Sequence, residues 1–150
     1  MKRAALYART STRDRQELGN QLHQLRAFAQ TQGWTIVAEF IDQESGSKAD
    51  RPQFQQMMEA AGRRDFDLLL FWALDRLTRE GALQALLHLN RLTSHGVAYR
   101  SLTESYLDSA GIFGEAIIAV LSTLAKQERL RLSERVRAGL DRARREGTRS

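Results

Sequence analysis

The chain has 150 residues, the length of one domain, and its 42% hydrophobic and 27% charged residues are an ordinary globular balance. The absence of cysteine excludes disulfides and thiolate metal sites, and no apolar run approaches the length of a membrane span. We therefore expect a soluble, cytoplasmic protein, and the formal net charge of +5 raises the question of an anionic partner.

The first third of the chain has the pattern of a strand, a helix and a second strand. Residues 2–9 are expected to form the first strand, which breaks into a polar stretch at Ser11 before a helix that ends at Gly33. Residues 34–41 are rich in β-branched and aromatic side chains, as strands are. A polar loop over residues 42–50 follows, and it lacks the upstream glycine spacing of a phosphate-binding P-loop.

Strand and helix continue to alternate in the middle of the chain. Pro52 fits the first turn of a helix over residues 52–63, and the apolar run 67–73 is typical of a central strand covered on both faces. A further helix is expected over residues 80–94 and a strand over residues 97–102. This alternation predicts an α/β fold with a flavodoxin-like, mostly parallel sheet of four to five strands flanked by helices.

Residues 111–146 contain no helix breaker apart from Gly114 and Gly139, which predicts a long C-terminal helix extending from the domain, about 50 Å in length. Its first part is apolar nearly all round, so we expect a second subunit to bury it. A bent helix packed back on its own domain is the alternative. The expected interface side chains are Ile117, Val120, Leu121 and Leu124.

The positive charge is confined to the C-terminal segment. Residues 1–125 are neutral overall, whereas residues 126–146 carry eight basic against four acidic side chains. Such a stripe is typical of contact with a phosphate backbone or an acidic partner, and a solvated helix face with internal ion pairs is the alternative. The candidate phosphate-contacting side chains are Lys126, Arg129, Arg131, Arg135, Arg137, Arg142, Arg144 and Arg145.

Arginines and a hydroxyl follow the ends of the first three predicted strands. They are Arg9 and Ser11 after the first strand, Asp42 and Arg51 in the loop after the second, and Asp75, Arg76 and Arg79 after the third. Because the carboxyl ends of parallel strands meet at one edge of a sheet, we expect these groups to converge. Four arginines around one hydroxyl suit phosphoryl transfer, since guanidinium groups neutralise non-bridging oxygens in the transition state. The alternative is that Ser11 or Thr12 only caps the next helix.

The three histidines fall in the middle or at the end of predicted helices, and the acidic residues are scattered, so no metal-ligand spacing is present. His23, His88 and His95 are therefore interpreted as surface or helix-face residues. No histidine lies in a loop at the expected crevice and no Gly-x-Ser-x-Gly pattern occurs, which argues against a Ser-His-Asp hydrolase.

Several polar motifs are spaced along the chain, and they are Tyr7-Ala8-Arg9-Thr10-Ser11-Thr12, Gln21, Asp42 with Ser45-Gly46, Asp50-Arg51-Pro52, Leu74-Asp75-Arg76-Leu77-Thr78-Arg79 and Gln127-Glu128-Arg129. Together these motifs resemble the catalytic domain of the serine recombinases, the resolvase/invertase family. They occur in unbroken order between about residues 3 and 147, and motifs in register are more specific than any single one.

The resemblance implies that Ser11 attacks a DNA phosphodiester to give a 5′-phosphoserine and a free 3′-hydroxyl, followed by strand exchange and religation without metal or high-energy cofactor. It implies that Arg9, Arg51, Arg76 and Arg79 hold the scissile phosphate, that Asp75 and Gln21 orient the reacting groups, and that Tyr7 supports the strand end. The partners that it implies are double-stranded DNA and further copies of the chain, as homodimers that pair into tetramers. Glu128 then falls near the active site or the subunit interface.

The expected organisation is a catalytic core over residues 1–110, a dimerisation and DNA-contacting helix over residues 111–147, and the start of a linker over residues 148–150. Members of this family carry a DNA-recognition module after the long helix, so we expect the chain to be an excised catalytic domain of a nucleoid-associated protein, with site recognition through a partner as the alternative. Two alternatives remain. One is a DNA-binding or assembly regulator that does not cut DNA, and the other is an unrelated flavodoxin-like or phosphatase-like domain.

Overall fold

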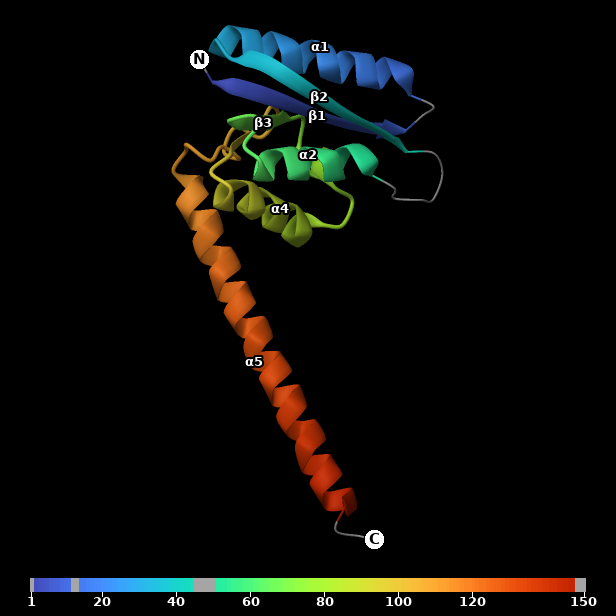
Figure 1. Cartoon of the computed structure of the whole chain (residues 1–150), viewed down its shortest axis with the longest axis vertical. Helices are drawn as coiled ribbons and strands as arrows, with labels where there is room; N and C mark the ends of the chain where they lie inside the picture. Colours follow the sequence, from blue (N-terminus) through green and yellow to red (C-terminus); the bar gives the residue numbers. More distant parts are fainter. Residues whose placement is uncertain (1, 12–13, 45–50, 148–150) are drawn as a thin grey trace. The chain divides into compact units, whose positions relative to one another are not determined.

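The computed structural model of the chain describes residues 2–11, 14–44 and 51–147 (Figure 1). Thr12, the predicted loop residues 45–50 and the predicted linker 148–150 lie outside the described residues. The elements are, in chain order, β1 (Arg3–Ser11), α1 (Arg15–Gln32), β2 (Thr35–Glu44), α2 (Pro52–Gly62), β3 (Leu68–Phe71), α3 (Leu74–Leu77), α4 (Ala82–Ser94), β4 (Ala98–Ser101) and α5 (Phe113–Gly147).

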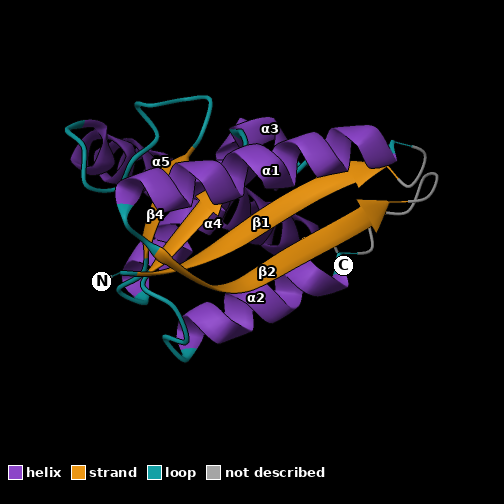
Figure 2. Cartoon of the chain, turned by 90° about the horizontal axis from the view of Figure 1, so that it is seen from above, coloured by secondary structure: helices purple, strands orange, loops and turns teal. Residues whose placement is uncertain are grey.

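The four described strands form a parallel sheet in the order β2-β1-β3-β4, which confirms the predicted fold class. Helix α1 covers one face of the sheet, and α2 and α4 cover the other (Figure 2). The central strand β1 supplies both layers by alternation. Leu6 and Ala8 pack with α1, whereas Ala5 and Tyr7 pack with α2 and α4. Since side chains alternate along a strand, Arg9 follows Tyr7 on the α2 side of the sheet.

Helix boundaries follow local signals that the sequence displays. Gly33 ends α1 in the left-handed conformation, with φ of +76°, and Pro52 occupies the first turn of α2. Asp14 is the N-cap of α1, because its carboxylate accepts from the Glu17 backbone N–H over 2.9 Å. The alternative that Ser11 caps this helix is therefore wrong, and Ser11 is the last residue of β1.

Two segments differ from the sequence prediction. Asp42 belongs to β2 and not to a loop, because the β1–β2 pairing continues as far as Ser11 and Glu44. Residues 74–77 form the short helix α3 where a loop was expected. Buried Leu77 holds this single turn against the core, a tertiary contact that four residues cannot reveal by their periodicity.

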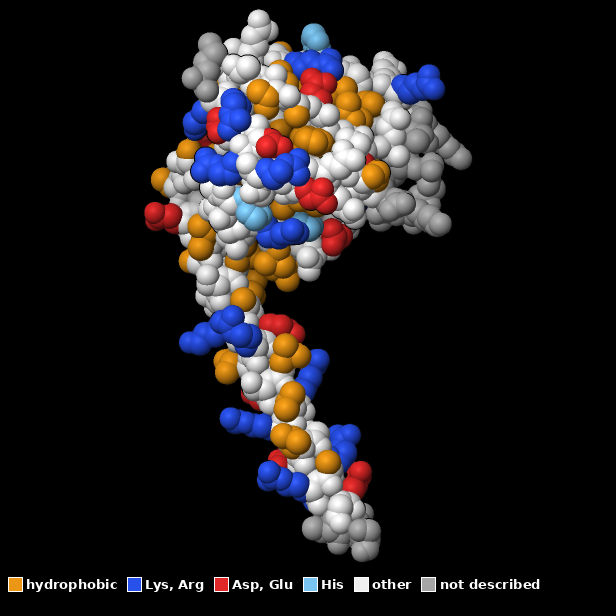
Figure 3. Space-filling model, viewed as in Figure 1, with side chains coloured by type: hydrophobic (Ala, Val, Ile, Leu, Met, Phe, Trp, Pro, Cys, Tyr) orange, Lys and Arg blue, Asp and Glu red, His pale blue; other side chains and the backbone are white. Residues whose placement is uncertain are grey.

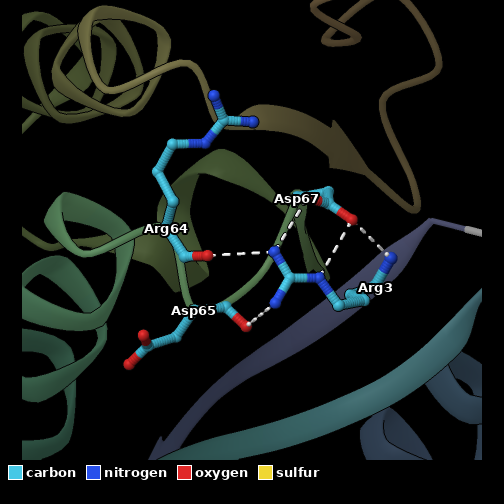
Figure 4. Close-up of polar contacts among 4 residues, drawn as sticks. All are labelled: Arg3, Arg64, Asp65 and Asp67. Atoms are coloured by element: carbon cyan, nitrogen blue, oxygen red, sulfur yellow. Dashed lines mark hydrogen bonds and ion pairs between the residues drawn. The ribbon is translucent and has the colours of Figure 1, made fainter.

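A polar cluster fixes the amino end of β1 to the connection between α2 and β3 (Figure 4). The Arg3 guanidinium donates to Asp67 Oδ1 over 3.1 Å and to the backbone carbonyls of Arg64 and Asp65 over 3.0 and 3.1 Å. These hydrogen bonds from Arg3 hold the pKa of Asp67 below its ordinary value. The cluster lies at the opposite end of β1 from Ser11.

The chain divides into two compact units, residues 1–115 and 116–150. The first unit contains the sheet and its covering helices. The second consists of the remainder of the 35-residue helix α5. Within the part of the chain that the structure describes, no helix combines the length and apolar character that a membrane crossing requires.

Candidate active site

Arg9 attaches α3 to the carboxyl end of β1. Its side chain is only 2% exposed, and it donates to the backbone carbonyls of Arg76, over 3.2 Å, and of Asp75. A buried guanidinium without acceptors would be costly, so these bonds fix both the side chain and the turn of helix that it contacts. The predicted residues Arg9, Asp75 and Arg76 are thus brought together.

Arg51 brings a second guanidinium to the same short helix. It is 8% exposed and donates through Nη1 to the carbonyl of Leu77 over 2.9 Å. The guanidinium carbon also lies 3.7 Å from the centre of the Phe54 ring, a cation–π contact. Arg51 immediately precedes α2, so the start of α2 is joined to the end of α3.

Tyr7 and Asp42 join the strands to the amino end of α2. The Tyr7 hydroxyl donates to Asp42 Oδ2 over 2.8 Å, and the same carboxylate accepts from the backbone N–H groups of Gln53 and Phe54, each over 3.0 Å. A carboxylate at a helix amino end is stabilised by the helix dipole and its free N–H groups. Burial and the adjacent Asp42 raise the pKa of Tyr7, so its hydroxyl stays protonated.

Arg76 points toward α1, where it forms an ion pair with Glu17 at 2.5 Å. Gln21 donates to the same Glu17 oxygen over 3.2 Å and is itself 2% exposed. Its Oε1 has no hydrogen-bond partner among the described residues. Glu17 therefore links two predicted site residues, although the sequence reasoning did not select it. The i, i+4 spacing of Glu17 and Gln21 on one helix was an available signal.

The remaining predicted residues of the site lie close by in sequence. Ser11 follows Arg9 by two positions on β1 and is half-buried, so strand alternation places it on the same side of the sheet. Asp75 and Arg79 are exposed, one within α3 and the other two residues after it. The first unit thus carries all eight of the predicted catalytic residues.

The predicted DNA-binding and interface residues lie on α5 and not in the first unit. All eight basic side chains of the DNA-binding set are exposed, and Lys and Arg side chains alternate with hydrophobic ones along this helix (Figure 3). Glu128 lies 3.9 Å from Arg131, one turn further on. The interface candidates Ile117, Val120, Leu121, Leu124 and Glu128 recur at helical spacing along one face, but Leu121 is only 4% exposed and is thus already buried in the single chain.

The histidines were expected at the surface or on helix faces, and they differ in exposure. His23 is exposed on α1, but the His88 side chain is 14% exposed and packs edge-on against Phe54, with ring centres 4.9 Å apart. His88 and His95 line a cavity of about 930 Å³ together with Arg51 and other side chains of α2 and α4. In residues 2–11, 14–44 and 51–147, no group of three or more His, Asp or Glu side chains is arranged to hold a metal ion.

The fold and the site together define an α/β domain with a hydroxyl at a strand end beside anchored arginines. Residues 4–149 match the family model described as Resolvase, N terminal domain, and the chain therefore belongs to the resolvase family. It is 40% identical over 108 residues to a DNA-invertase of Escherichia phage P1, an alignment that covers 72% of this chain and 56% of that protein. The chain spans about half the length of the curated relatives it matches.

Solved structures of similar fold include proteins named as a recombinase and an integrase. The N-terminal catalytic domain of TP901-1 integrase superposes with a TM-score of 0.69 at 28% identity, covering 85% of this chain and 97% of that one. A resolvase family site-specific recombinase from Streptococcus pneumoniae has a TM-score of 0.69 at 27% identity and covers 97% and 99% of the two chains. The alternative of an unrelated flavodoxin-like or phosphatase-like domain is therefore wrong.

Proposed function

We propose that this chain is the catalytic domain of a site-specific DNA recombinase in which Ser11 is the nucleophile. The observation that carries the proposal is the anchoring of three arginines around α3. Arg9 reaches α3 from the end of β1, Arg51 from the start of α2, and Arg76 belongs to α3 itself. Groups fixed in this way are preorganised to stabilise charge on a phosphate, and they lie beside the strand end that presents Ser11.

In the proposed reaction, Ser11 Oγ attacks the phosphorus of a DNA phosphodiester. A bond forms between Oγ and phosphorus, the bond from phosphorus to the 3′ oxygen breaks, the serine proton leaves, and the 3′ oxygen accepts a proton. Guanidinium groups of Arg9, Arg51, Arg76 and Arg79 neutralise the non-bridging oxygens. The phosphoserine retains a phosphodiester, so a 3′-hydroxyl reverses the step in a new strand without metal or ATP.

Three further residues support this reaction, Gln21 and Asp75 by orienting the reacting groups and Tyr7 by supporting the strand end. Gln21 is held by Glu17, which also pairs with Arg76, so one carboxylate positions both side chains. Asp75 is exposed on α3 and is available to a substrate group. Tyr7 keeps the strand end in register with α2 through Asp42. These roles are part of the proposal.

The proposal extends to α5. Residues 1–110 act as the catalytic core and residues 111–147 as a helix for dimerisation and DNA contact. Val120 and Leu124 are 53% and 41% exposed, which supports coverage of this face by a second copy in a homodimer, with tetramers forming on paired DNA sites. Sedimentation tests this part, since a monomer at every concentration would contradict it.

The experiment for the nucleophile uses the chain fused to a zinc-finger DNA-binding module, with supercoiled DNA that carries paired target sites. Wild type and Ser11→Ala are compared after denaturation and protease treatment. We expect protein attached covalently to 5′ ends with wild type only. Binding and pairing of sites without any covalent species would instead indicate a regulator that does not cut DNA.

A further inference from the structure

The two residues that flank Arg79 hydrogen bond to each other. Thr78 Oγ1 donates to Glu80 Oε1 over 2.8 Å and accepts from the Glu80 backbone N–H over 3.1 Å. Thr78 is 3% exposed and has extended backbone angles, so its hydroxyl is a fixed point in the core. The pair closes a ring around the backbone of Arg79, in the connection between α3 and α4.

His88, a residue of α4, makes a further contact with Glu80. Its Nε2 lies 3.1 Å from Glu80 Oε1, and hydrogen bonds from His88 and then Thr78 lower the pKa of Glu80. His88 Nδ1 is buried and has no hydrogen-bond partner among the described residues. The tautomer with its proton on Nε2 fits this environment, because it donates to Glu80 and leaves no buried N–H unsatisfied.

The His88 ring also contacts Phe54, the residue against which the Arg51 guanidinium packs. It makes a T-shaped contact with the Phe54 ring, and the Arg51 guanidinium lies over that same ring. Arg51 precedes α2 and Arg79 lies between α3 and α4, and both line the cavity that His88 also lines. His88 thus connects the Arg79 segment, through Glu80, with the Arg51 segment, through Phe54, in addition to the direct hydrogen bond from Arg51 to the Leu77 carbonyl.

We infer that His88 is a positioning residue, which sets the Arg79 segment relative to Arg51 through the hydrogen bond of its Nε2 to Glu80 while its side chain packs against Phe54. The inference rests on the proposed function, since the consequence of this positioning is the rate of Ser11 attack. His88 itself touches neither the nucleophile nor the scissile phosphate. The donor at Nε2 is the feature that matters, and glutamine supplies an N–H donor at a similar distance from the backbone.

The test compares His88→Leu, His88→Gln and His95→Leu in the zinc-finger fusion at saturating DNA. His95 lines the same cavity but is not in the ring around Arg79, so it is the matched control. We expect His88→Leu to slow covalent adduct formation about tenfold or more with unchanged DNA affinity, because small displacements of positioned groups are costly in rate. His88→Gln and His95→Leu should stay within about twofold of wild type. A wild-type rate in His88→Leu would overturn the inference and leave the proposed function intact.

A second measurement on the 150-residue chain does not depend on cleavage. Hydrogen exchange at the Glu80 amide should accelerate in His88→Leu and not in His88→Gln, while exchange at Leu69 in the central strand stays unchanged. Equal acceleration at Glu80 and Leu69 would identify His88 as a core side chain only, and no acceleration at Glu80 would also overturn the inference. If wild type forms no adduct, the proposed function fails, and the role of His88 in that reaction fails with it.

Discussion

The same residue type is used in opposite ways in the two units of the chain. In the first unit, Arg9 and Arg51 are at most 8% exposed, and each donates to backbone carbonyls of α3. On α5, the basic side chains are exposed and repeat along the helix without a core around them. The buried arginines of the first unit are thus fixed in position by their hydrogen bonds, whereas the exposed arginines of α5 form an extended positively charged surface.

This difference determines how substitutions should act. A buried guanidinium with defined acceptors is not replaceable by another cation, since geometry and charge both matter. Exposed cations on one helix contribute through screened, additive contacts with a polyanion. A single conservative substitution in the first unit should therefore lower the reaction rate. On α5, several substitutions together should be needed, and they should change the DNA affinity and its salt dependence.

The largest expected effect is that of Arg9→Lys. An ammonium cannot reproduce the planar fork that joins the Asp75 and Arg76 carbonyls, so we expect covalent adduct formation to fall about a hundredfold. The rate is measured in a single turnover with saturating DNA. Arg137→Lys on α5 is the control, and it should react at the wild-type rate. Equal rates for both variants would show that the fixed geometry of the Arg9 guanidinium does not contribute to the reaction rate.

A smaller effect is expected from replacing Arg135, Arg137 and Arg142 by glutamine together. Each lost phosphate contact lowers the slope of log affinity against log salt by about 0.9, so the slope should fall by up to about 2.7. Adduct formation at saturating DNA should stay within about twofold of wild type. Fluorescence anisotropy across salt concentrations measures the slope.

The control for this triple variant is Arg63→Gln, an exposed arginine of the first unit that pairs with Asp65. Its slope should equal that of wild type. An unchanged slope in the triple variant would favour the other interpretation of α5, a solvated face with internal ion pairs.

The next effect concerns folding and not DNA. Tyr7→Phe removes the donor to the buried Asp42 carboxylate, and the free energy of unfolding should fall by about 1–2 kcal/mol. Urea denaturation measures it. Tyr106→Phe is the matched control, because Tyr106 is 54% exposed, and it should unfold as wild type does. Similar losses in both variants would mean that the Tyr7–Asp42 bond is energetically neutral.

Much of the fold was predictable because its signals are local. The apolar run at 68–71, the left-handed Gly33 and Pro52 at a helix start each depend on neighbouring residues only. The grouping of arginines was predictable from parallel strands alone. The contacts of Asp42 and the place of His88 were not, because each depends on a partner from a distant element. The cap of α2 by Asp42 requires the β1–β2 register, and the role of His88 requires α4 to face α2.

The smallest expected effect lies at the amino end of β1, where Arg3→Gln removes an exposed ion pair with Asp67. The pKa of Asp67 is lowered in the folded protein, so the pair stabilises the fold at pH values above the ordinary aspartate pKa, and that contribution is lost as the pH falls through the lower, folded value. The difference in melting temperature between wild type and Arg3→Gln should thus be constant from neutral pH to about pH 4 and shrink below it. The control is Asp67→Asn. The difference in melting temperature between Asp67→Asn and Arg3→Gln should not depend on pH.

The opposite outcome is a difference in melting temperature between wild type and Arg3→Gln that persists unchanged into strong acid. It would assign the whole effect to the hydrogen bonds of Arg3 with the backbone carbonyls of residues 64 and 65, which do not titrate. Arg3 would then act as Arg9 does, through the backbone, and exposure alone would not separate the two kinds of arginine.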